Sequence, residues 1–241
     1  MKAFFETFIQ HWFFTPNSQC PICGRILLHT NAYFCPECQK TLPFNRAHYC
    51  LKCGRPLIEA GNYCQNCGMY AYPFSGGFSL MHFDEQSKKV IYAIKFKGRP
   101  QLAIFLGQMM AKEMQSCAWI DHIDCIVPVP IHKKRLAERG YNQSAYLSEG
   151  LKIGLKKNVI VNKHLLIRIL DTPHQIGMNR EERCKNLQNA FAVEDQAKIV
   201  NKHILLVDDV NTTGSTLNHC AQTLLDEGAA GIFIATCCAV E

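Results

Sequence analysis

The residues that decide the fold are Ile204-Leu-Leu-Val-Asp-Asp-Val-Asn-Thr-Thr-Gly-Ser-Thr216. Four consecutive aliphatic side chains at 204–207 predict a strand that is buried on both faces, as in the middle of a parallel sheet. Two carboxylates follow at Asp208 and Asp209, and the apolar residues from Leu217 to Glu227 recur at helical spacing. The stretch therefore predicts a strand, an acidic pair, a short loop and a helix in an α/β protein.

The loop between the acids and the helix has the chemistry of a phosphate site. Backbone N–H groups at a helix start lack partners, and the helix dipole favours an anion there. The loop has no lysine and not the spacing of a Walker motif, which argues against a nucleoside triphosphatase. Ionised carboxylates accept hydrogen bonds, which suits a vicinal diol such as that of ribose. A helix cap is the simpler explanation, but capping needs only one of these residues. The candidates for a ligand with a monophosphate beside hydroxyls are Asp208, Asp209, Asn211, Thr212, Thr213, Gly214, Ser215 and Thr216.

Composition indicates a globular protein in a reducing compartment. The chain has 241 residues, 48% of them hydrophobic, and a formal charge of +6, which permits an anionic partner. Eight of its fourteen cysteines stand in Cys-x-x-Cys pairs, which favours metal binding over disulfides. No signal peptide or transmembrane segment is apparent, so we expect a cytoplasmic protein. Residues 1–14 are too short and polar to span a bilayer, but helical packing and peripheral membrane contact both stay open.

The cysteine pairs predict two structural zinc sites. Each pair forms a knuckle that directs two thiolates at one ion. We expect sequential pairing, with a cross-braced arrangement as the alternative. Residues 19–69 have few aliphatic side chains, so the metal should supply most of their folding free energy. The expected ligands are Cys20, Cys23, Cys35 and Cys38 for one Zn²⁺ and Cys50, Cys53, Cys64 and Cys67 for the other.

The chain divides into four expected segments. Residues 1–18 should form an N-terminal helix, 19–70 the double zinc ribbon, 71–77 a linker and 78–241 the α/β domain. Pro73, Gly76 and Gly77 indicate the linker. Within the α/β domain we expect strands at 78–83, 123–129 and 231–240, and helices at 87–97, 101–117 and 142–157.

The stretch from Ile204 to Thr216 resembles the 5-phosphoribosyl-1-pyrophosphate (PRPP) motif of type I phosphoribosyltransferases, a strand, two acids and a Thr-Thr-Gly-x-Thr loop. The resemblance implies that the acids hold the ribose hydroxyls, that the loop holds the 5-phosphate, and that Mg²⁺ accompanies PRPP. A polar segment at 171–186 is expected to be either a lid with Gln175, Arg180 and Arg183 or an exposed helix. The pyrophosphate loop would be His132, Lys133, Lys134 and Arg135, a basic surface loop being the alternative.

The whole chain resembles the ComF family, the ComFC and GntX-like proteins. Besides the knuckles and the acidic pair, the resemblance is carried by Lys95-Phe-Lys-Gly98, Pro128-Val-Pro-Ile-His132, Arg139-Gly-Tyr-Asn-Gln143, and Gln175 with Arg183-x-x-Asn186. It implies a type I phosphoribosyltransferase-like parallel sheet flanked by helices, behind an N-terminal double zinc ribbon with four cysteines for each ion. It also implies a cytoplasmic bacterial protein of natural transformation that handles incoming single-stranded DNA, with a competence helicase or recombination proteins as candidate partners.

Two functions of different class stay open. The first is a protein that binds single-stranded DNA and retains a PRPP site, and the second is an active Mg²⁺-dependent phosphoribosyltransferase with an unknown acceptor. The aromatics Tyr33, Phe34, Tyr49, Tyr63, Tyr70 and Tyr72 offer stacking faces to DNA or form the ribbon's own core. The candidate DNA-binding cations are Lys95, Lys97, Arg99, Lys133, Lys134, Arg135 and Arg139.

Overall fold

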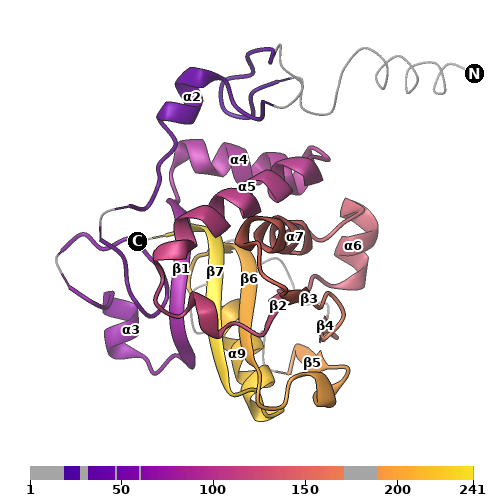
Figure 1. The fold of residues 1–241 in the computed structure, drawn as a ribbon. Helices are drawn as coiled ribbons and strands as arrows, with labels where there is room; N and C mark the ends of the chain where they lie inside the picture. The colour runs from indigo at the N-terminus through magenta and orange to yellow at the C-terminus, as the bar shows by residue number, and fades with distance from the viewer. Residues whose placement is uncertain (1–18, 28–31, 47, 60, 171–188, 241) are drawn as a thin grey trace, which may run out of the picture.

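A five-stranded parallel sheet forms the centre of the molecule (Figure 1). The computed structural model describes residues 19–27, 32–46, 48–59, 61–170 and 189–240. The strand order is β1 (Phe74–His82), β7 (Gly231–Ala239), β6 (His203–Asn211), β2 (Cys125–Pro128) and β3 (Ile160–Val161). The deciding strand of the sequence, β6, is therefore the central one.

Helices cover both faces of the sheet. The helices α4 (Glu85–Phe96), α5 (Pro100–Glu113) and α7 (Gln143–Leu155) lie on one face, and α9 (Ser215–Asp226) lies on the other (Figure 1). The helix α6 (Lys133–Arg139) connects β2 to α7. A small antiparallel pair, β4 (Leu166–Arg168) and β5 (Phe191–Val193), lies beside α9. The short 3-10 helices are Met114–Ser116, Ile120–His122 and Gln196–Lys198. The predicted parallel sheet flanked by helices is confirmed.

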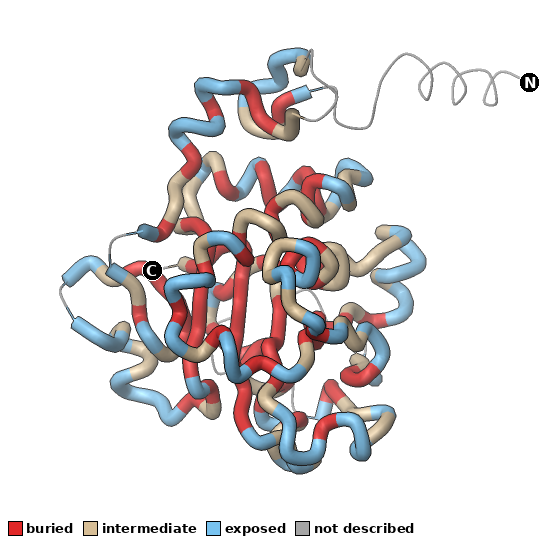
Figure 2. The backbone as a smooth tube through the Cα atoms, viewed as in Figure 1, coloured by how far each residue is buried: buried red, intermediate tan, exposed pale blue. Residues whose placement is uncertain are grey.

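Both faces of β6 are apolar because each one faces helices. Leu205 and Val207 belong to the core under α5 and α7, and Ile204 and Leu206 belong to the core under α9. All four side chains are fully buried, and the central strands are buried along most of their length (Figure 2). An uninterrupted aliphatic run is what a strand covered on both sides requires.

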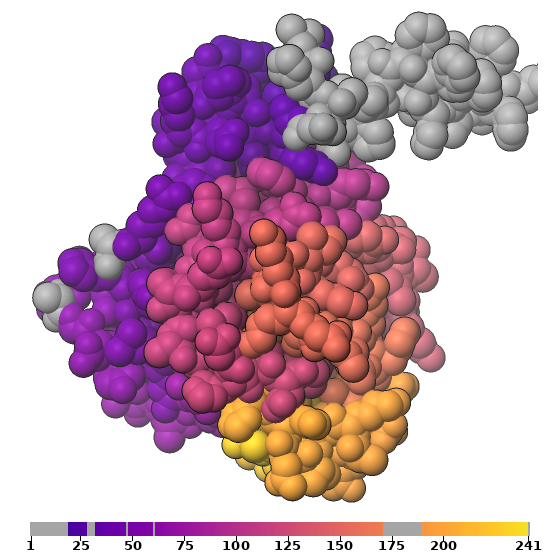
Figure 3. Space-filling model, viewed as in Figure 1, coloured from indigo at the N-terminus to yellow at the C-terminus, as the bar shows by residue number. Residues whose placement is uncertain are grey.

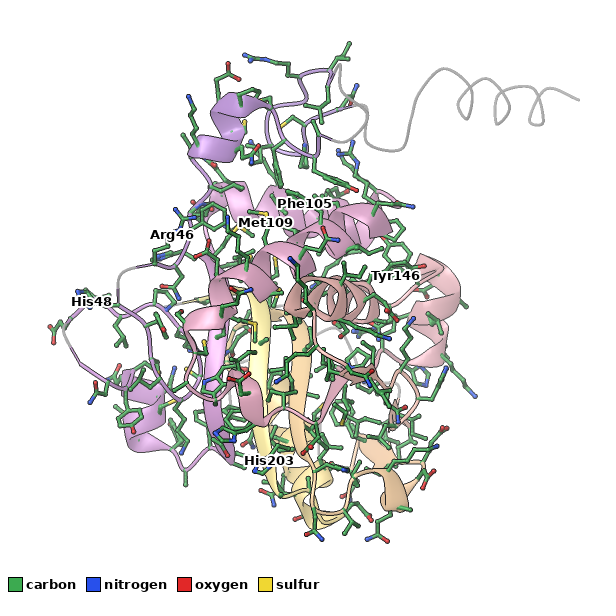
Figure 4. All side chains as sticks on the ribbon, in the orientation of Figure 1. Arg46, His48, Phe105, Met109, Tyr146 and His203 are labelled. Carbon is green, nitrogen blue, oxygen red and sulfur yellow. The ribbon has the colours of Figure 1, made fainter. Side chains whose placement is uncertain are left out.

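Two zinc ribbons pack against different parts of this domain. The first, which contains α2 (Pro36–Lys40), projects as a lobe above α4 and α5 (Figure 3). Its Tyr33 ring stacks on Phe105 of α5 with centroids 4.6 Å apart, and Phe105 and Met109 lie beneath this ribbon (Figure 4). The second, which contains α3 (Gln65–Met69), lies beside β1 (Figure 1). The backbone N–H of Gly77 donates to the carbonyl oxygen of Leu51 at 3.1 Å.

Two sequence-based expectations of local structure differ from what is observed. The first strand starts at Phe74, not at residue 78, so it begins inside the stretch predicted as a linker. Gly76 and Gly77 have no side chain because other groups occupy that space: a Cβ atom would lie 2.7 Å from Trp119 at the first and 2.7 Å from the Cys53 backbone at the second. The predicted pyrophosphate loop after β2 is instead the cap residue His132 and the start of the helix α6. The predicted N-terminal helix lies outside the described residues.

The contact between α5 and α7 depends on glycine. A Cβ atom on Gly150 would lie 2.0 Å from the carbonyl oxygen of Ile104, and one on Gly107 would lie 2.2 Å from that of Leu147. We expect Gly150→Ala to lower the free energy of unfolding by about 1–3 kcal/mol, because the helices must move apart. Denaturant unfolding of the zinc-loaded protein measures this loss. Gly61→Ala is the matched control, since no atom lies within 4 Å of its Cβ position. Equal losses in the two variants would contradict the explanation.

Candidate functional site

The eight knuckle cysteines form two tetrads. In each tetrad the four Sγ atoms lie within 4.8 Å of one another. The Sγ atoms of Cys23 and Cys35 are 3.7 Å apart, and those of Cys53 and Cys64 are 3.6 Å apart. A tetrahedron with Zn–S bonds of about 2.3 Å has edges of about 3.8 Å, so this donor set fits Zn²⁺. The tetrads are Cys20, Cys23, Cys35, Cys38 and Cys50, Cys53, Cys64, Cys67, which confirms sequential pairing.

Backbone hydrogen bonds shape each first knuckle. The N–H of Cys50 donates to the carbonyl oxygen of Arg55, and that of Gly54 donates to Cys50, both at 2.8 Å. Gly54 has a φ of 73°, in the left-handed region that glycine tolerates. The same turn recurs in the first ribbon, where Gly24 has a φ of 76°. The Cys-x-x-Cys-Gly sequence thus predicts the geometry that is found.

The predicted phosphate loop joins β6 to α9. The strand continues to Asn211, so both acids lie within it, and α9 begins at Ser215 after Gly214, whose φ is 81°. The hydroxyls of Thr213 and Ser215 are 2.9 Å apart. A small depression is lined by Asp208, Val210, Asn211, Thr212, Thr213, Gly214, Ser215, Thr216 and Leu217. All predicted ligand-binding residues except Asp209 therefore lie around one concavity.

The two acids have different surroundings. Asp209 is only 3% exposed, and its carboxylate lies 2.9 Å from Lys95 Nζ and accepts a hydrogen bond from Gln143 Nε2 at 2.6 Å. Asp208 is partly exposed and accepts hydrogen bonds from Ser144 Oγ at 3.1 Å and from the Asp209 N–H at 2.8 Å. Burial, and then the charge of Asp209, raise the pKa of Asp208 to about 7. Asp209 is thus a fixed, paired charge, and Asp208 is the acid that faces the depression.

The predicted cations have different surroundings. His132 is buried and caps α6, its Nδ1 accepting the Lys134 N–H at 3.4 Å, while the side chains of Lys133 and Lys134 are exposed on that helix. Lys95 pairs with Asp209. Arg99 donates to the carbonyl oxygen of Gln19 at 2.8 Å. A groove is lined by Lys95, Phe96, Gly98, Arg135, Glu138 and Arg139, and a second groove, bordered by the first ribbon, contains Lys97 and Arg99.

The structure adds residues that sequence reasoning missed. Gln143 accepts a hydrogen bond from Arg139 at its Oε1 and donates one to Asp209 from its Nε2, so it joins the two. The only sequence signal for this residue is its place in the Arg139-Gly-Tyr-Asn-Gln143 pattern. Tyr92 and Phe96 of α4 are 54% and 62% exposed, although helical spacing alone would not distinguish them from core residues. Arg55 of the second ribbon reaches the phosphate loop, and no sequence signal predicted this contact.

The predicted aromatic residues differ in exposure, and the predicted lid residues lie outside the described part of the chain. Phe34 and Tyr72 are buried, and Tyr33 stacks on α5, so these rings belong to the packing of the ribbons. Tyr63 and Tyr70 are 60% and 46% exposed, and Tyr49 is half-buried. The lid residues Gln175, Arg180 and Arg183 lie outside the described part of the chain.

The raised pKa of Asp208 makes stability depend on pH. Between about pH 4 and pH 7 the folded state holds a proton that the unfolded state has lost, so the free energy of unfolding falls as the pH rises. Asp208→Asn should remove this fall, which amounts to at most about 4 kcal/mol. Denaturant unfolding from pH 4 to pH 8 measures the difference from wild type. Asp121→Asn, at a side chain that is 90% exposed, is the control. Parallel curves for wild type and Asp208→Asn would contradict the assignment.

Comparison with known proteins identifies relatives over most of the chain. Residues 9–68 match the double zinc ribbon domain. The chain is 29% identical over 188 residues to the DNA utilization protein YhgH of Salmonella typhimurium, covering 77% of this chain and 81% of the relative. It is 28% identical over 183 residues to competence protein F of Haemophilus influenzae, covering 74% and 79%. Competence protein ComFC of Bacillus subtilis is 29% identical over 152 residues, covering 63% and 59%.

Solved structures give a more distant likeness. An allosteric regulatory enzyme of purine biosynthesis matches 61% of this chain and 30% of its own with a TM-score of 0.41 and 15% identity. The glutamine PRPP amidotransferase from Bacillus subtilis matches the same shares with a TM-score of 0.40 and 14% identity. This chain thus spans about a third of those proteins.

Within the described residues, no helix has the length and apolar character needed to cross a bilayer. The relatives and the matched ribbon together make the chain a homologue of the ComF-type competence and DNA utilization proteins.

Proposed function

We propose that this protein handles DNA during its uptake or utilization, binds single-stranded DNA and retains a PRPP-binding site. The names of its relatives, competence protein and DNA utilization protein, support the DNA role. The observation that carries the proposal is a surface along α4 on which exposed aromatic rings stand among cations. We call it the α4 surface, and it consists of Lys88, Lys89, Tyr92, Phe96, Lys97 and Arg99 with Arg135 and Arg139 beside it.

Helical geometry places three side chains of the α4 surface in one row. Lys88, Tyr92 and Phe96 are spaced by four residues, so they lie on the same side of α4, and all three are exposed. Lys97 Nζ lies 5.9 Å from the centroid of the Tyr92 ring, and the Arg139 guanidinium lies 5.3 Å from that of Phe96. Cations that follow a backbone, beside rings on which bases stack, are the two parts of a single-strand binding groove.

The grooves at either side of this row extend it. One is bordered by the first zinc ribbon and contains Lys88, Lys89, Tyr92, Lys97 and Arg99. The other contains Phe96, Arg135 and Arg139. A strand that crossed α4 would meet phosphate-binding cations on both sides of the two rings. We therefore assign phosphate binding to four of the predicted cations, Lys97, Arg99, Arg135 and Arg139. Lys95 is not among them, because it pairs with Asp209.

The PRPP part of the proposal rests on the loop after β6. Asp208 and the hydroxyl-bearing loop surround one depression at the start of a twelve-residue helix, which suits a ribose 5-phosphate. Mg²⁺ prefers carboxylate and phosphate oxygens. Asp208 supplies a carboxylate at the depression, and the ligand would supply the phosphates. The ion neutralises charge on pyrophosphate when bound.

Single-stranded DNA binding should require the aromatic pair. With a fluorescein-labelled 20-residue oligothymidylate, we expect Tyr92→Ala with Phe96→Ala to weaken binding by about tenfold or more, because base stacking contributes about 1–3 kcal/mol per base. Fluorescence anisotropy at several salt concentrations measures affinity and its salt dependence. Replacing Arg135 and Lys97 by Ala should reduce the salt slope.

Two controls make this experiment specific. Tyr63→Ala removes an equally exposed ring from the second ribbon, and Lys198→Ala removes an exposed cation next to β5. Both should bind as wild type does. If the aromatic double variant binds like Tyr63→Ala, the α4 surface is not the DNA site. If wild type shows no salt-dependent binding, the DNA role itself is wrong.

The alternative function is an active phosphoribosyltransferase. The intact Asp208 and loop favour PRPP binding, yet no segment of the sequence indicates a pocket for a nucleobase acceptor. We expect PRPP and Mg²⁺ to yield no pyrophosphate above the uncatalysed rate with nucleobases as acceptors. A coupled pyrophosphate assay measures this, with Asp208→Asn as the control. Release by wild type that this variant abolishes would establish the enzyme in place of the binding protein.

A further inference from the structure

A buried arginine from the second zinc ribbon stands at the base of the phosphate loop. Arg55 is 3% exposed, and its Nη2 donates to the carbonyl oxygen of Thr212 and to Asn211 Oδ1, the latter at 3.2 Å. Among the residues that the structure describes, no carboxylate lies within ion-pair distance of it. A buried charge without a counterion is costly. An anion bound at the adjacent loop would place a negative charge beside this guanidinium.

We propose that Arg55 is a positioning residue for the phosphate loop, so that the second zinc ribbon forms part of the site for a phosphate monoester. This inference rests on the proposed PRPP site and names the group that organises it. The loop itself carries no lysine or arginine. Arg55 is a positive charge from another segment that donates directly to this loop.

Four hydrogen bonds tie the loop to the ribbon side of the molecule. Besides the bonds from Arg55, the hydroxyl of Tyr72 donates to the carbonyl oxygen of Thr213 at 3.1 Å. Asn211 Nδ2 donates to the carbonyl oxygen of Cys53, a zinc ligand, at 3.4 Å. The loop cannot shift without disturbing the segment that holds the second metal.

These bonds also fix the direction of the loop's donors. In a trans peptide the C=O and the following N–H point in opposite directions. The carbonyls of Thr212 and Thr213 point toward Arg55 and Tyr72, so the N–H groups of Thr213 and Gly214 point away from the ribbon. Donation from a cation to a carbonyl polarises the peptide and strengthens its N–H as a donor. Arg55 thus both orients and strengthens the donors that an anion would meet.

Coupling of this kind is reciprocal. If the ribbon strengthens phosphate binding, then a bound phosphate must stabilise the ribbon by the same free energy. A phosphate ligand should therefore slow the release of one of the two zinc ions, the one held by the second tetrad. Arg55 and the bonds around it carry this coupling. A residue with only a structural role in the ribbon would not make zinc release depend on the ligand.

The test uses the full zinc-loaded chain and ribose 5-phosphate, which needs no Mg²⁺. Calorimetry should show Arg55→Gln binding about tenfold more weakly than wild type, as expected for loss of charge-assisted hydrogen bonds. Arg55→Lys should bind better than Arg55→Gln, because the charge remains. Arg46→Gln is the matched control, since Arg46 is an exposed arginine paired with Glu113 (Figure 4). Zinc release to a chromogenic chelator should slow with the ligand in wild type and not in Arg55→Gln.

Each outcome bears on the inference. The inference is overturned if Arg55→Gln retains two zinc ions and binds ribose 5-phosphate as tightly as Arg46→Gln does. If Arg55→Gln loses zinc, Tyr72→Phe serves as the second test, because it removes one loop contact and keeps the ring that stacks on Phe74. If Tyr72→Phe then binds ribose 5-phosphate as wild type does, and the ligand slows its zinc release as in wild type, the inference is overturned. Absence of binding by wild type would remove the phosphate site itself, and with it this role for Arg55.

Discussion

The backbone contact between the second zinc ribbon and β1 is the constraint on which the candidate site depends. A Cβ atom on Gly54 would lie 2.4 Å from the Phe78 backbone, and one on Gly77 would lie 2.7 Å from the Cys53 backbone, so neither glycine has room for a side chain. This contact places the second ribbon at the end of the sheet where β6 runs into its loop. The ribbon cannot hold itself there by a large apolar core, since its interior is mostly cysteine. The metal therefore fixes both the shape of the ribbon and its distance from the loop.

A buried ion pair organises the other side of the acids. The buried contact of Asp209 with Lys95 and Gln143 joins the central strand to α4 and α7. Removing Lys95 would leave the Asp209 carboxylate buried without its counterion, which costs more than the pair contributes to stability. The main role of the pair is therefore to position α4 against β6, and its contribution to the stability of the fold is small. It holds the C-terminal end of α4 against the strand from which Asp208 faces the depression.

Sequence was sufficient for features that one local pattern determines. The aliphatic run before Asp208 specified a central strand, and the Cys-x-x-Cys-Gly repeats specified knuckles, because each pattern constrains its own backbone. It failed where a residue's surroundings come from distant segments. Gly76 and Gly77 were interpreted as a linker because nothing local shows that Trp119 and the Cys53 backbone occupy their side-chain space. The partners of Lys95 and Arg55 were missed for the same reason, since both contacts join segments more than 100 residues apart.

The two ribbons share one metal chemistry, yet they meet different parts of the protein. The first rests on α5 through the stack of Tyr33 on Phe105 and borders the groove beside α4. The second reaches the phosphate loop through Arg55. On the functions proposed here, one ribbon frames the DNA surface and the other frames the phosphate site. Lys95 lies between the two, because it lines the groove with Arg135 and pairs with Asp209. Because Asp209 already holds this ammonium group, the ion pair joins the groove beside α4 to the strand that carries Asp208.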